Sequence, residues 1–242
     1  MKFLSTTSQW KEAVNNWEGI GDAPAKRNRP HRFGFKVLEN DFLERYMATA
    51  HWTLPGLWAI PAVIYLLYRS VDGHGLAEIA WLFGAGMLGW TFIEYWLHRW
   101  AFHGAPSQSP LLRNIQFMLH GYHHEFPDDP GRLVAPPVMA VPIFVILTTL
   151  IVLCFPGNWP AILAGTFFGY LCYDWVHYYT HHGRHRGALG KFMRRFHMEH
   201  HYKNANIQFG LSSPLWDFVF LTYRRPTSPT RVERACLGQE SH

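Results

Sequence analysis

Residues 133–173 read LVAPPVMAVPIFVILTTLIVLCFPGNWPAILAGTFFGYLCY and contain no Asp, Glu, Lys, Arg or His. Only the turn-forming sequence PGNWP at 156–160 interrupts this apolar run. About 20 apolar residues are enough to cross the hydrocarbon core of a bilayer, so the run can form two membrane-spanning helices joined by a tight turn. Because helices of water-soluble proteins rarely lack charges over such a length, the run predicts a membrane protein.

Two segments nearer the N-terminus also have the composition of membrane spans. Tyr46 to Tyr68 is uncharged apart from His51, and Ile79 to Ile93 is short but free of charge. The sequence therefore predicts an all-α integral membrane protein with four transmembrane helices, arranged as two hairpins. The second segment contains three glycines that fit close packing between helices, Gly84, Gly86 and Gly89.

The basic residues predict the orientation in the membrane. Of the 22 Lys and Arg, only Arg69 lies in the short turns after the first and third spans, so the positive-inside rule places both termini in the cytoplasm. We expect a cytoplasmic N-terminal segment (1–45), a membrane domain (46–225) and a C-terminal tail (226–242). The net charge of +5 indicates attraction to anionic lipid headgroups, and no motif points to nucleic acid.

Eleven of the 16 histidines fall into four compact clusters. In HGYHH (120–124) and HMEHH (197–201) the histidines stand at i, i+3 and i+4, so each cluster is predicted to point several rings at one spot. His98 and His103 are five apart, so we expect the helix to end or bulge between them. The clusters are His98 and His103; His120, His123 and His124; His177, His181 and His182; and His197, His200 and His201.

These spacings predict a metal centre. Imidazole is the commonest protein ligand for borderline transition metals, and one ion takes about four to six protein ligands, so roughly ten converging rings suit two ions. The fold expected is thus a membrane domain with a cytoplasmic, histidine-rich helical cap that holds a dinuclear site. His182 is ambiguous, because it would point away from the face that His177 and His181 share. The remaining histidines are treated as ordinary polar residues: His31, His51, His74, His185 and His242.

Each acidic residue near the clusters either supports a metal ligand or is an ordinary charged group at a surface or a helix end. Tyr173 and Asp174 precede His177 by about one turn, so Asp174 either hydrogen-bonds a ligand imidazole or is a charge at a helix end. Tyr173 and Asp174 are therefore the candidate catalytic residues. Three further carboxylates either support ligands or are solvated surface groups: Glu199, Asp128 and Asp129.

Five stretches of the chain resemble the fatty acid hydroxylase and sterol desaturase superfamily. The resemblance covers most of the chain from about the first span onward, and the stretch at 119–137 most resembles fatty acid 2-hydroxylases. The stretches are HRWAFH (98–103), LHGYHHEFPDDPGRLVAPP (119–137), GYLCYDWVHYYTHHG (169–183), FHMEHHY (196–202) and FGLSSPLWDFVF (209–220).

The resemblance implies a non-haem di-iron monooxygenase that hydroxylates a fatty acid or the acyl chain of a membrane lipid, with C2 as the expected position. It implies two iron ions as cofactors, with dioxygen as co-substrate, and zinc as an ion that can fill such a site after purification. By matching motif positions, the metal ligands would be His98, His103, His120, His123, His124, His177, His181, His197, His200 and His201. The stretch from Leu211 to Asp217 would form a turn and a helix that covers the site.

The resemblance also implies an external source of electrons. Fungal and animal 2-hydroxylases often carry a fused haem-binding domain, for which this chain has no room, so a separate ferredoxin or cytochrome is expected. Oxidation of a sterol, a carotenoid or an amino-lipid headgroup stays open as an alternative reaction of the same superfamily. A histidine-rich metal transporter is the alternative from another class, although it would place ligands within its spans. The acyl carrier, chain length, native metal and oligomeric state are left open.

Overall fold

The computed structural model describes residues 5–20 and 35–225. In this part of the chain the regular elements are all helices, and the one isolated antiparallel bridge joins Thr6 and Leu38, which agrees with the all-α prediction. His31, His242 and the predicted tail lie outside the described residues. The helices are α1 (Ser8–Asn16), α2 (Asp41–Leu43), α3 (Leu54–Val71), α4 (Leu76–Trp96), α5 (Pro110–Gln116), α6 (Tyr122–Glu125), α7 (Pro137–Cys154), α8 (Trp159–His182), α9 (Ala188–Tyr202) and α10 (Leu215–Val219), with π-helical turns η1 (Glu44–Ala48), η2 (Leu97–Phe102) and η3 (Phe117–Gly121).

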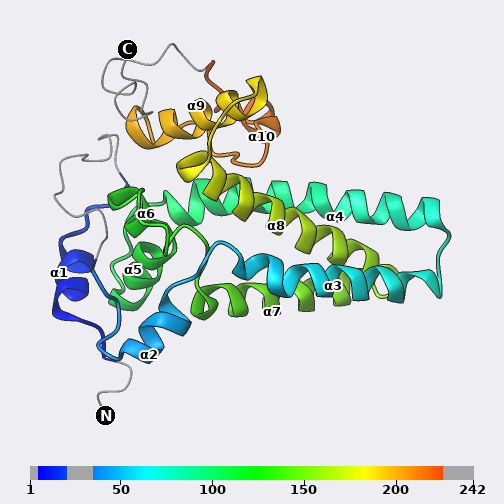
Figure 1. The fold of residues 1–242 in the computed structure, drawn as a ribbon, viewed down its shortest axis with the longest axis horizontal. Helices are drawn as coiled ribbons and strands as arrows, with labels where there is room; N and C mark the ends of the chain where they lie inside the picture. Colours follow the sequence, from blue (N-terminus) through cyan, green and yellow to red (C-terminus); the bar gives the residue numbers. More distant parts are fainter. Residues whose placement is uncertain (1–4, 21–34, 226–242) are drawn as a thin grey trace.

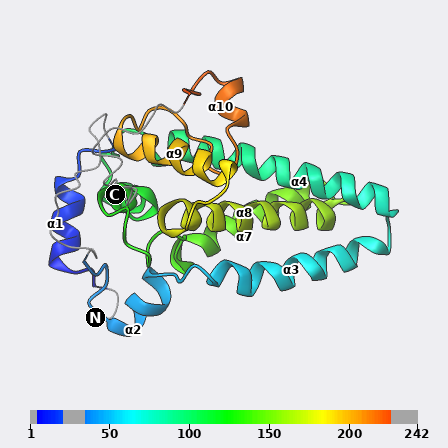
Figure 2. The same cartoon turned by 45° about the horizontal axis from the view of Figure 1, so that its top comes forward.

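Four long helices, α3, α4, α7 and α8, run along the long axis of the molecule (Figure 1, Figure 2). In the described residues, three segments are long and apolar enough to cross a membrane: Leu54–Val71, Leu76–Phe102 and Pro137–Cys154. The fourth predicted span falls in α8, which is not among these three. α8 packs against both α3 and α4, and it has more buried residues than any other described helix. The four-span arrangement in two hairpins therefore stays a prediction.

The first span begins later in the chain than the sequence pattern predicts. The pattern predicts a start at Tyr46, whereas α3 begins at Leu54. Residues 44–48 form the π-helical turn η1 instead, and the chain then turns before Pro55 enters the first turn of α3. Proline is favoured there because it has no N–H group to leave without a partner.

The backbones of α4 and α8 touch at two glycines. A Cβ atom added to Gly86 would lie 2.0 Å from the carbonyl oxygen of Ile162, and one added to Gly165 would lie 1.9 Å from that of Phe83. Close packing was predicted for three glycines of this span, but Gly84 and Gly89 have open space around their Cβ positions. Of these three glycines, only Gly86 lies where a side chain would separate the two helices.

Replacing Gly86 by Ala is expected to destabilise the protein, because the added methyl group collides with backbone that cannot move aside alone. Overpacking of this kind costs about 1–3 kcal/mol or more. The matched change Gly84→Ala meets no atom and is expected to be neutral or slightly stabilising. Thermal unfolding of the detergent-solubilised variants measures the difference. Equal unfolding temperatures for the two variants would show that the α4–α8 contact does not limit stability.

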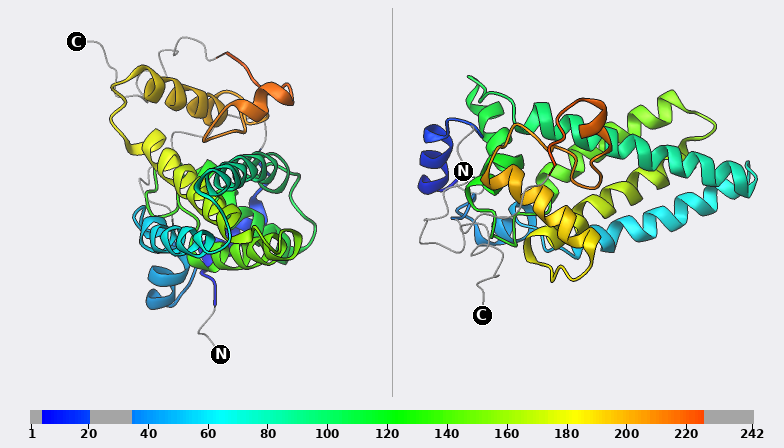
Figure 3. Two further views of the ribbon diagram at one scale, coloured as in Figure 1. Left: turned by 90° about the vertical axis from the view of Figure 1, so that its right-hand side faces the viewer. Right: turned by 90° about the horizontal axis from the view of Figure 1, so that it is seen from above.

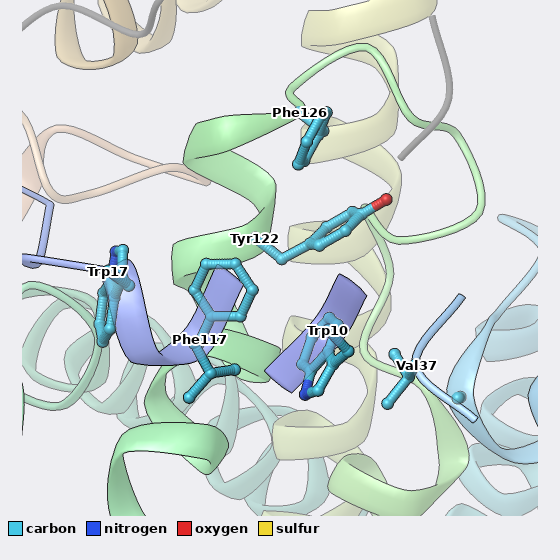
Figure 4. Packing of buried hydrophobic residues seen from close by; sticks show 8 residues of the cluster. Trp10, Trp17, Val37, Phe117, Tyr122 and Phe126 are labelled. Carbon is cyan, nitrogen blue, oxygen red and sulfur yellow. The ribbon is translucent and has the colours of Figure 1, made fainter. Parts of the chain in front are cut away.

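The N-terminal segment packs closely on the rest of the molecule. Trp10 of α1 and Trp17, the residue directly after α1, are buried against Phe117 and Tyr122, which belong to η3 and α6 (Figure 4). Glu44 accepts hydrogen bonds from the backbone N–H groups of residues 37 and 38, at 3.1 and 2.9 Å, and forms an ion pair with the guanidinium group of Arg132. These contacts support the short helices that carry the second histidine cluster. The domain boundaries given from the sequence stay a prediction.

Candidate metal centre

The structure brings all ten predicted ligand histidines together, as two groups of five. Within each group, one nitrogen from every ring lies within 4.8 Å of the others. The two groups are neighbours, since the rings of His124 and His201 stack with centroids 4.2 Å apart. The His98 group is His98, His103, His120, His124 and His200, and the His177 group is His123, His177, His181, His197 and His201.

Each group draws its rings from several elements. The His98 group comes from η2 and the residue after it, η3, α6 and α9, whereas the His177 group comes from α6, α8 and α9. Figure 3 shows that α9 lies over one side of the bundle, beside the C-terminal end of α8. The site therefore exists only when the cap and the membrane helices are assembled.

The clusters HGYHH and HMEHH do not each point at one spot, which corrects the prediction. His120 and His124 belong to one group and His123 to the other, and HMEHH is divided in the same way. Residues four apart on a helix are separated by about 40° around its axis, whereas adjacent residues are separated by about 100°. The i, i+4 pairs can therefore share an ion, while the histidine between them reaches the neighbouring group.

The bulge predicted between His98 and His103 is present. Residues 97–102 form the π-helical turn η2, and the N–H group of His103 donates to the carbonyl oxygen of His98 at 3.1 Å, a bond that spans five residues. The extra residue in this turn rotates His103 toward His98, so that their ring centroids lie 4.8 Å apart. A π-bulge thus brings together two rings that a regular helix would separate.

The Nε2 atoms of both groups converge at the spacing of ligands on one ion. In the His98 group, the Nε2–Nε2 separations are 3.0 Å for His98 to His120 and for His120 to His124, and 3.1 Å for His103 to His200. In the His177 group, the four separations lie between 2.9 and 3.0 Å. Nitrogens bound about 2.1 Å from a metal ion, with angles near 90° between them, would be about 3.0 Å apart.

Two backbone carbonyls fix the tautomers of their histidines. Nδ1 of His98 lies 2.5 Å from the carbonyl oxygen of Phe209, and Nδ1 of His200 lies 2.7 Å from that of Ile207. A carbonyl oxygen only accepts, so both Nδ1 atoms carry hydrogen and the Nε2 lone pairs point into the group. Nitrogen lone pairs that face each other across the Nε2–Nε2 separations given above repel one another. A cation bound between them would stabilise this arrangement.

Burial keeps these rings neutral, which is the form that binds metal. Removal from water lowers the pKa of His120, His124, His200 and His201 well below the ordinary value for histidine, and neighbouring histidines lower it further. The pKa of His123 and of His197 is lowered in the same way. A set of neutral imidazoles without carboxylates suits borderline divalent metals such as iron or zinc.

A loop between α9 and α10 supplies the two carbonyl groups, and two buried carboxylates hold it. Asp217 of α10 accepts from the N–H groups of Phe209 and Gly210, both at 2.8 Å. Glu94 of α4 accepts from the N–H groups of Leu211 and Ser212, at 2.7 and 2.8 Å. No local sequence pattern indicated a role for either carboxylate. A carboxylate inside a candidate membrane span is unusual, and this signal could have singled out Glu94.

Tyr173 and Asp174 lie on α8 next to the His177 group. The ring of Tyr173 is 5.9 Å from that of His177. Asp174 is fully buried, but its carboxylate makes no hydrogen bond with a ligand histidine in the described part of the chain. The structure thus places both residues beside the site without showing the predicted contact from Asp174 to an imidazole.

Of the other three acidic candidates, two have structural partners and one is exposed. Glu199 is buried and lies 3.1 Å from Lys203 Nζ. Asp129 accepts from the hydroxyl group of Tyr122 at 2.7 Å, and Asp128 is exposed. None of these contacts joins a carboxylate to a ligand ring.

Several histidines stay outside both groups: His51, His74 and His185, as the sequence predicts, and His182, which the sequence leaves ambiguous. His182 is exposed, and its ring lies 4.9 Å from that of Tyr178. Nε2 of His74 lies 2.9 Å from the side-chain oxygen of Asn158, and His185 bonds the carbonyl oxygen of Tyr179. His51 pairs with a neighbouring threonine.

An apolar cavity reaches both groups of histidines. This inner cavity, of about 70 Å³, is lined by His120, His123 and His177 and by apolar residues such as Trp90 and Leu97. A second, larger cavity of about 590 Å³ lies between α3 and α7 and is lined by residues such as Trp58 and Thr148. Five residues line both cavities: Val134, Ala135, Ala140, Phe144 and Tyr170.

Aromatic rings form the boundary between the two cavities. The ring of Phe144 lies 4.6 Å from that of Tyr170 and 5.0 Å from that of Trp58, and Trp90 packs against Tyr170 at 5.2 Å. The outer cavity follows α7 from Pro137 to Thr149, which is about 18 Å of helix. A long apolar group can therefore lie along α7 with its end at the histidines.

Comparison with known proteins gives consistent matches. Residues 83–222 match the family model described as fatty acid hydroxylase. The chain is 38% identical over 191 residues to a dihydroceramide fatty acyl 2-hydroxylase of Arabidopsis thaliana, covering 78% of this chain and 80% of the relative. It is 38% identical over 210 residues to a ceramide very long chain fatty acid hydroxylase of Saccharomyces cerevisiae, covering 84% of this chain and 53% of that protein.

A mammalian relative and a solved structure match in the same way. A fatty acid 2-hydroxylase of Mus musculus is 34% identical over 209 residues, which are 77% of this chain and 56% of the relative. A solved structure of full-length scs7p, in which only the hydroxylase domain is visible, superposes with a TM-score of 0.74. It is 31% identical, and the match covers 93% of this chain and 82% of that one.

Proposed function

The chain belongs to the fatty acid hydroxylase family, and we propose on this basis that it hydroxylates C2 of the acyl chain of a fatty acid or fatty acyl lipid. It is a hydroxylating oxidoreductase, as are the relatives named above. The observation that carries the proposal is the pair of five-histidine groups that meets an apolar cavity. An acyl chain fits such a cavity, and oxidation of its C–H bonds requires a metal centre.

We infer that the two groups hold two iron ions. When bound, iron supplies the activation of dioxygen that side chains cannot provide, and an unactivated C–H bond requires it. The donor set supports this inference, because it is all imidazole, neutral and preorganised by the carbonyl groups of residues 207 and 209. Zinc binds such sites more tightly than ferrous iron, so it is expected to compete during purification.

The residues around the inner cavity would position the substrate. Trp90, Leu97 and Phe102 give it an apolar wall that excludes water from the reacting carbon. C2 is adjacent to the carbonyl end of an acyl chain, so that end must lie at the histidines while the tail extends into the outer cavity. Tyr173 lines the inner cavity as well, which keeps it a candidate for contact with the substrate.

We further propose that the chain crosses the membrane four times, with α8 as the fourth span and the termini and metal centre cytoplasmic. The distribution of Lys and Arg supports this orientation. α8 lies inside the bundle against α3 and α4, so it faces little lipid and needs less apolar surface than they do. The hydroxylase domain would then extend over residues 46–225.

The acyl chain would reach the metal centre from the bilayer, between α3 and α7. We expect Ala140→Trp to block this route, because Ala140 lines both cavities. Hydroxylation of a long-chain lipid in vesicles should fall at least about tenfold, while the metal content stays unchanged. Ile146→Trp on the exposed side of α7 is the matched control and should keep full activity. If Ala140→Trp also keeps full activity, the route lies elsewhere.

Two electrons are needed for each hydroxylation, since one oxygen atom of dioxygen enters the substrate and the other becomes water. We propose that a separate ferredoxin or cytochrome donates them. Purified protein should therefore turn over slowly with a chemical reductant and faster when a donor protein is added. A full rate with reductant alone would contradict this part of the proposal.

Lipid analysis tests the reaction itself. Cells that express the chain are given a fatty acid with deuterium at both positions on C2, and their lipids are compared with those of cells that lack it. The proposal predicts acyl chains that gain one oxygen and lose one deuterium. Retention of both deuterium atoms, with oxygen appearing on a sterol, a carotenoid or a headgroup, would assign the chain to another reaction of the superfamily.

A further inference from the structure

The segment that contains α10 exposes apolar side chains and almost no charge. Residues 209–222 read FGLSSPLWDFVFLT, and their one charged residue, Asp217, is fully buried. Four large apolar side chains of this segment are exposed: Leu215 by 42%, Phe218 and Val219 by 54% each, and Leu221 by 82%. A surface of this composition is unfavourable in water, because nothing polar offsets the apolar area.

Leu221 adds a second observation. Its backbone has φ of +59°, in the left-handed region that favours glycine, directly after the end of α10. The strained position therefore carries the most exposed large side chain of the segment, where glycine would relieve the strain. In water such a leucine has no stabilising role, whereas in lipid its side chain would be buried.

The position of α10 shows what its exposed side faces. Nε1 of Trp216 donates to Oγ1 of Thr91 at 3.0 Å, and the ring of Phe92 lies 4.9 Å from that of Trp216. Thr91 and Phe92 belong to the candidate membrane span Leu76–Phe102. Figure 1 and Figure 3 show α10 beside α4, on the outside of the bundle. The outer side of α10 is thus continuous with the lipid-facing surface of α4.

Basic residues follow the apolar side chains at once. Arg224 and Arg225 are both exposed, two and three residues after the buried Thr222. Helices that lie in the plane of a membrane combine an apolar side with arginines at the level of anionic headgroups. The order of residues from 215 to 225 has this combination.

We propose that α10 is an in-plane membrane anchor, with the side chains of Leu215, Phe218, Val219 and Leu221 among lipid acyl chains near the cytoplasmic headgroups. Its inner side holds the loop of the metal centre, because Asp217 binds the N–H groups of Phe209 and Gly210. The bilayer would thus help to keep in place the carbonyl groups that orient His98 and His200. This proposal requires a membrane-spanning α4 and does not depend on which lipid is hydroxylated.

Fluorescence quenching in vesicles tests the anchor. In full-length protein with its three cysteines replaced by serine, Leu221→Cys is labelled with bimane and reconstituted into phosphatidylcholine vesicles. A lipid with a nitroxide on its acyl chain should quench this label several-fold more than a label at Glu12→Cys, an exposed position on α1. Aqueous iodide should show the reverse order. Leu153→Cys, which is 72% exposed on α7, gives the value for a label in lipid.

A second labelled position shows whether the quenching measured at Leu221 is particular to that residue or common to α10. Phe218→Cys lies within α10, has ordinary helical surroundings and should give the same pattern as Leu221→Cys. If iodide quenches both α10 labels as strongly as the Glu12 label, while the lipid nitroxide does not, α10 faces water and the proposal is wrong. Hydroxylase activity does not enter this measurement, so its outcome is separate from that of the proposed function.

Discussion

Replacing His181 by Ala is expected to abolish hydroxylation, whereas replacing the adjacent His182 by Ala leaves it unchanged. His181 belongs to the His177 group, and its Nε2 atom lies 2.9 Å from that of His197. His182 is exposed on the other side of α8, where its ring packs on Tyr178. Removal of an outer partner of a metal ligand costs about 10–100-fold in activity, and removal of a ligand should cost more.

Metal analysis of the same two variants distinguishes loss of an ion from loss of the fold. His181→Ala should bind about one ion per chain in place of about two, because the His98 group keeps all five rings. His182→Ala should bind the same amount as the unmodified protein. Full activity and full metal content in both variants would exclude His181 as a ligand. Equal losses of activity and metal in both variants would contradict the proposal that His181 binds metal and His182 does not.

Replacing Asp217 by Ala is expected to cost the protein on the order of 4 kcal/mol in stability, since it leaves the buried N–H groups of Phe209 and Gly210 without an acceptor. The hydroxyl group of Thr222, which donates to Asp217 at 2.7 Å, loses its acceptor too. The loop that orients His98 and His200 would then move, so metal bound by the His98 group should be lost first.

Thermal unfolding and metal content of detergent-solubilised protein measure both effects. Asp217→Asn keeps the shape of the side chain and one acceptor oxygen, so it should be less destabilising than Asp217→Ala. Asp128→Ala, at an exposed aspartate, is the control and should change neither quantity. An Asp217→Ala variant with normal stability and two bound ions would show that the loop is held by other contacts.

The helical pattern predicted several of the long helices, and the histidine spacing predicted the clustered rings of the candidate metal centre. The uncharged run at 133–173 predicted the two helices that the structure shows as α7 and α8. The five-residue interval between His98 and His103 predicted the bulge that the structure shows at η2. Both are local signals, because charge depletion and helical periodicity act over about 20 residues or fewer. The ten histidines that lie together in the structure are the ten that the family resemblance implies as metal ligands.

What the sequence did not predict depends on contacts between distant residues. The division of HGYHH between two groups is set by α8 and α9, which bring rings to both sides of α6. Glu94 meets Leu211 and Ser212 across more than a hundred residues, so no local pattern indicated that pairing. Likewise, Trp10 and Trp17 lie in a polar segment and pack on Phe117, although nothing near them in the sequence is apolar enough to suggest it.

If the ten clustered histidines act as ligands, this chain holds two metal ions between them. Measuring iron per chain in protein purified anaerobically, with iron supplied, tests it most directly. We expect about two irons per chain, with about one remaining in a variant that lacks a ligand of either group. No stoichiometric metal in the folded, unmodified protein would contradict it, and the histidines would then have only a structural role.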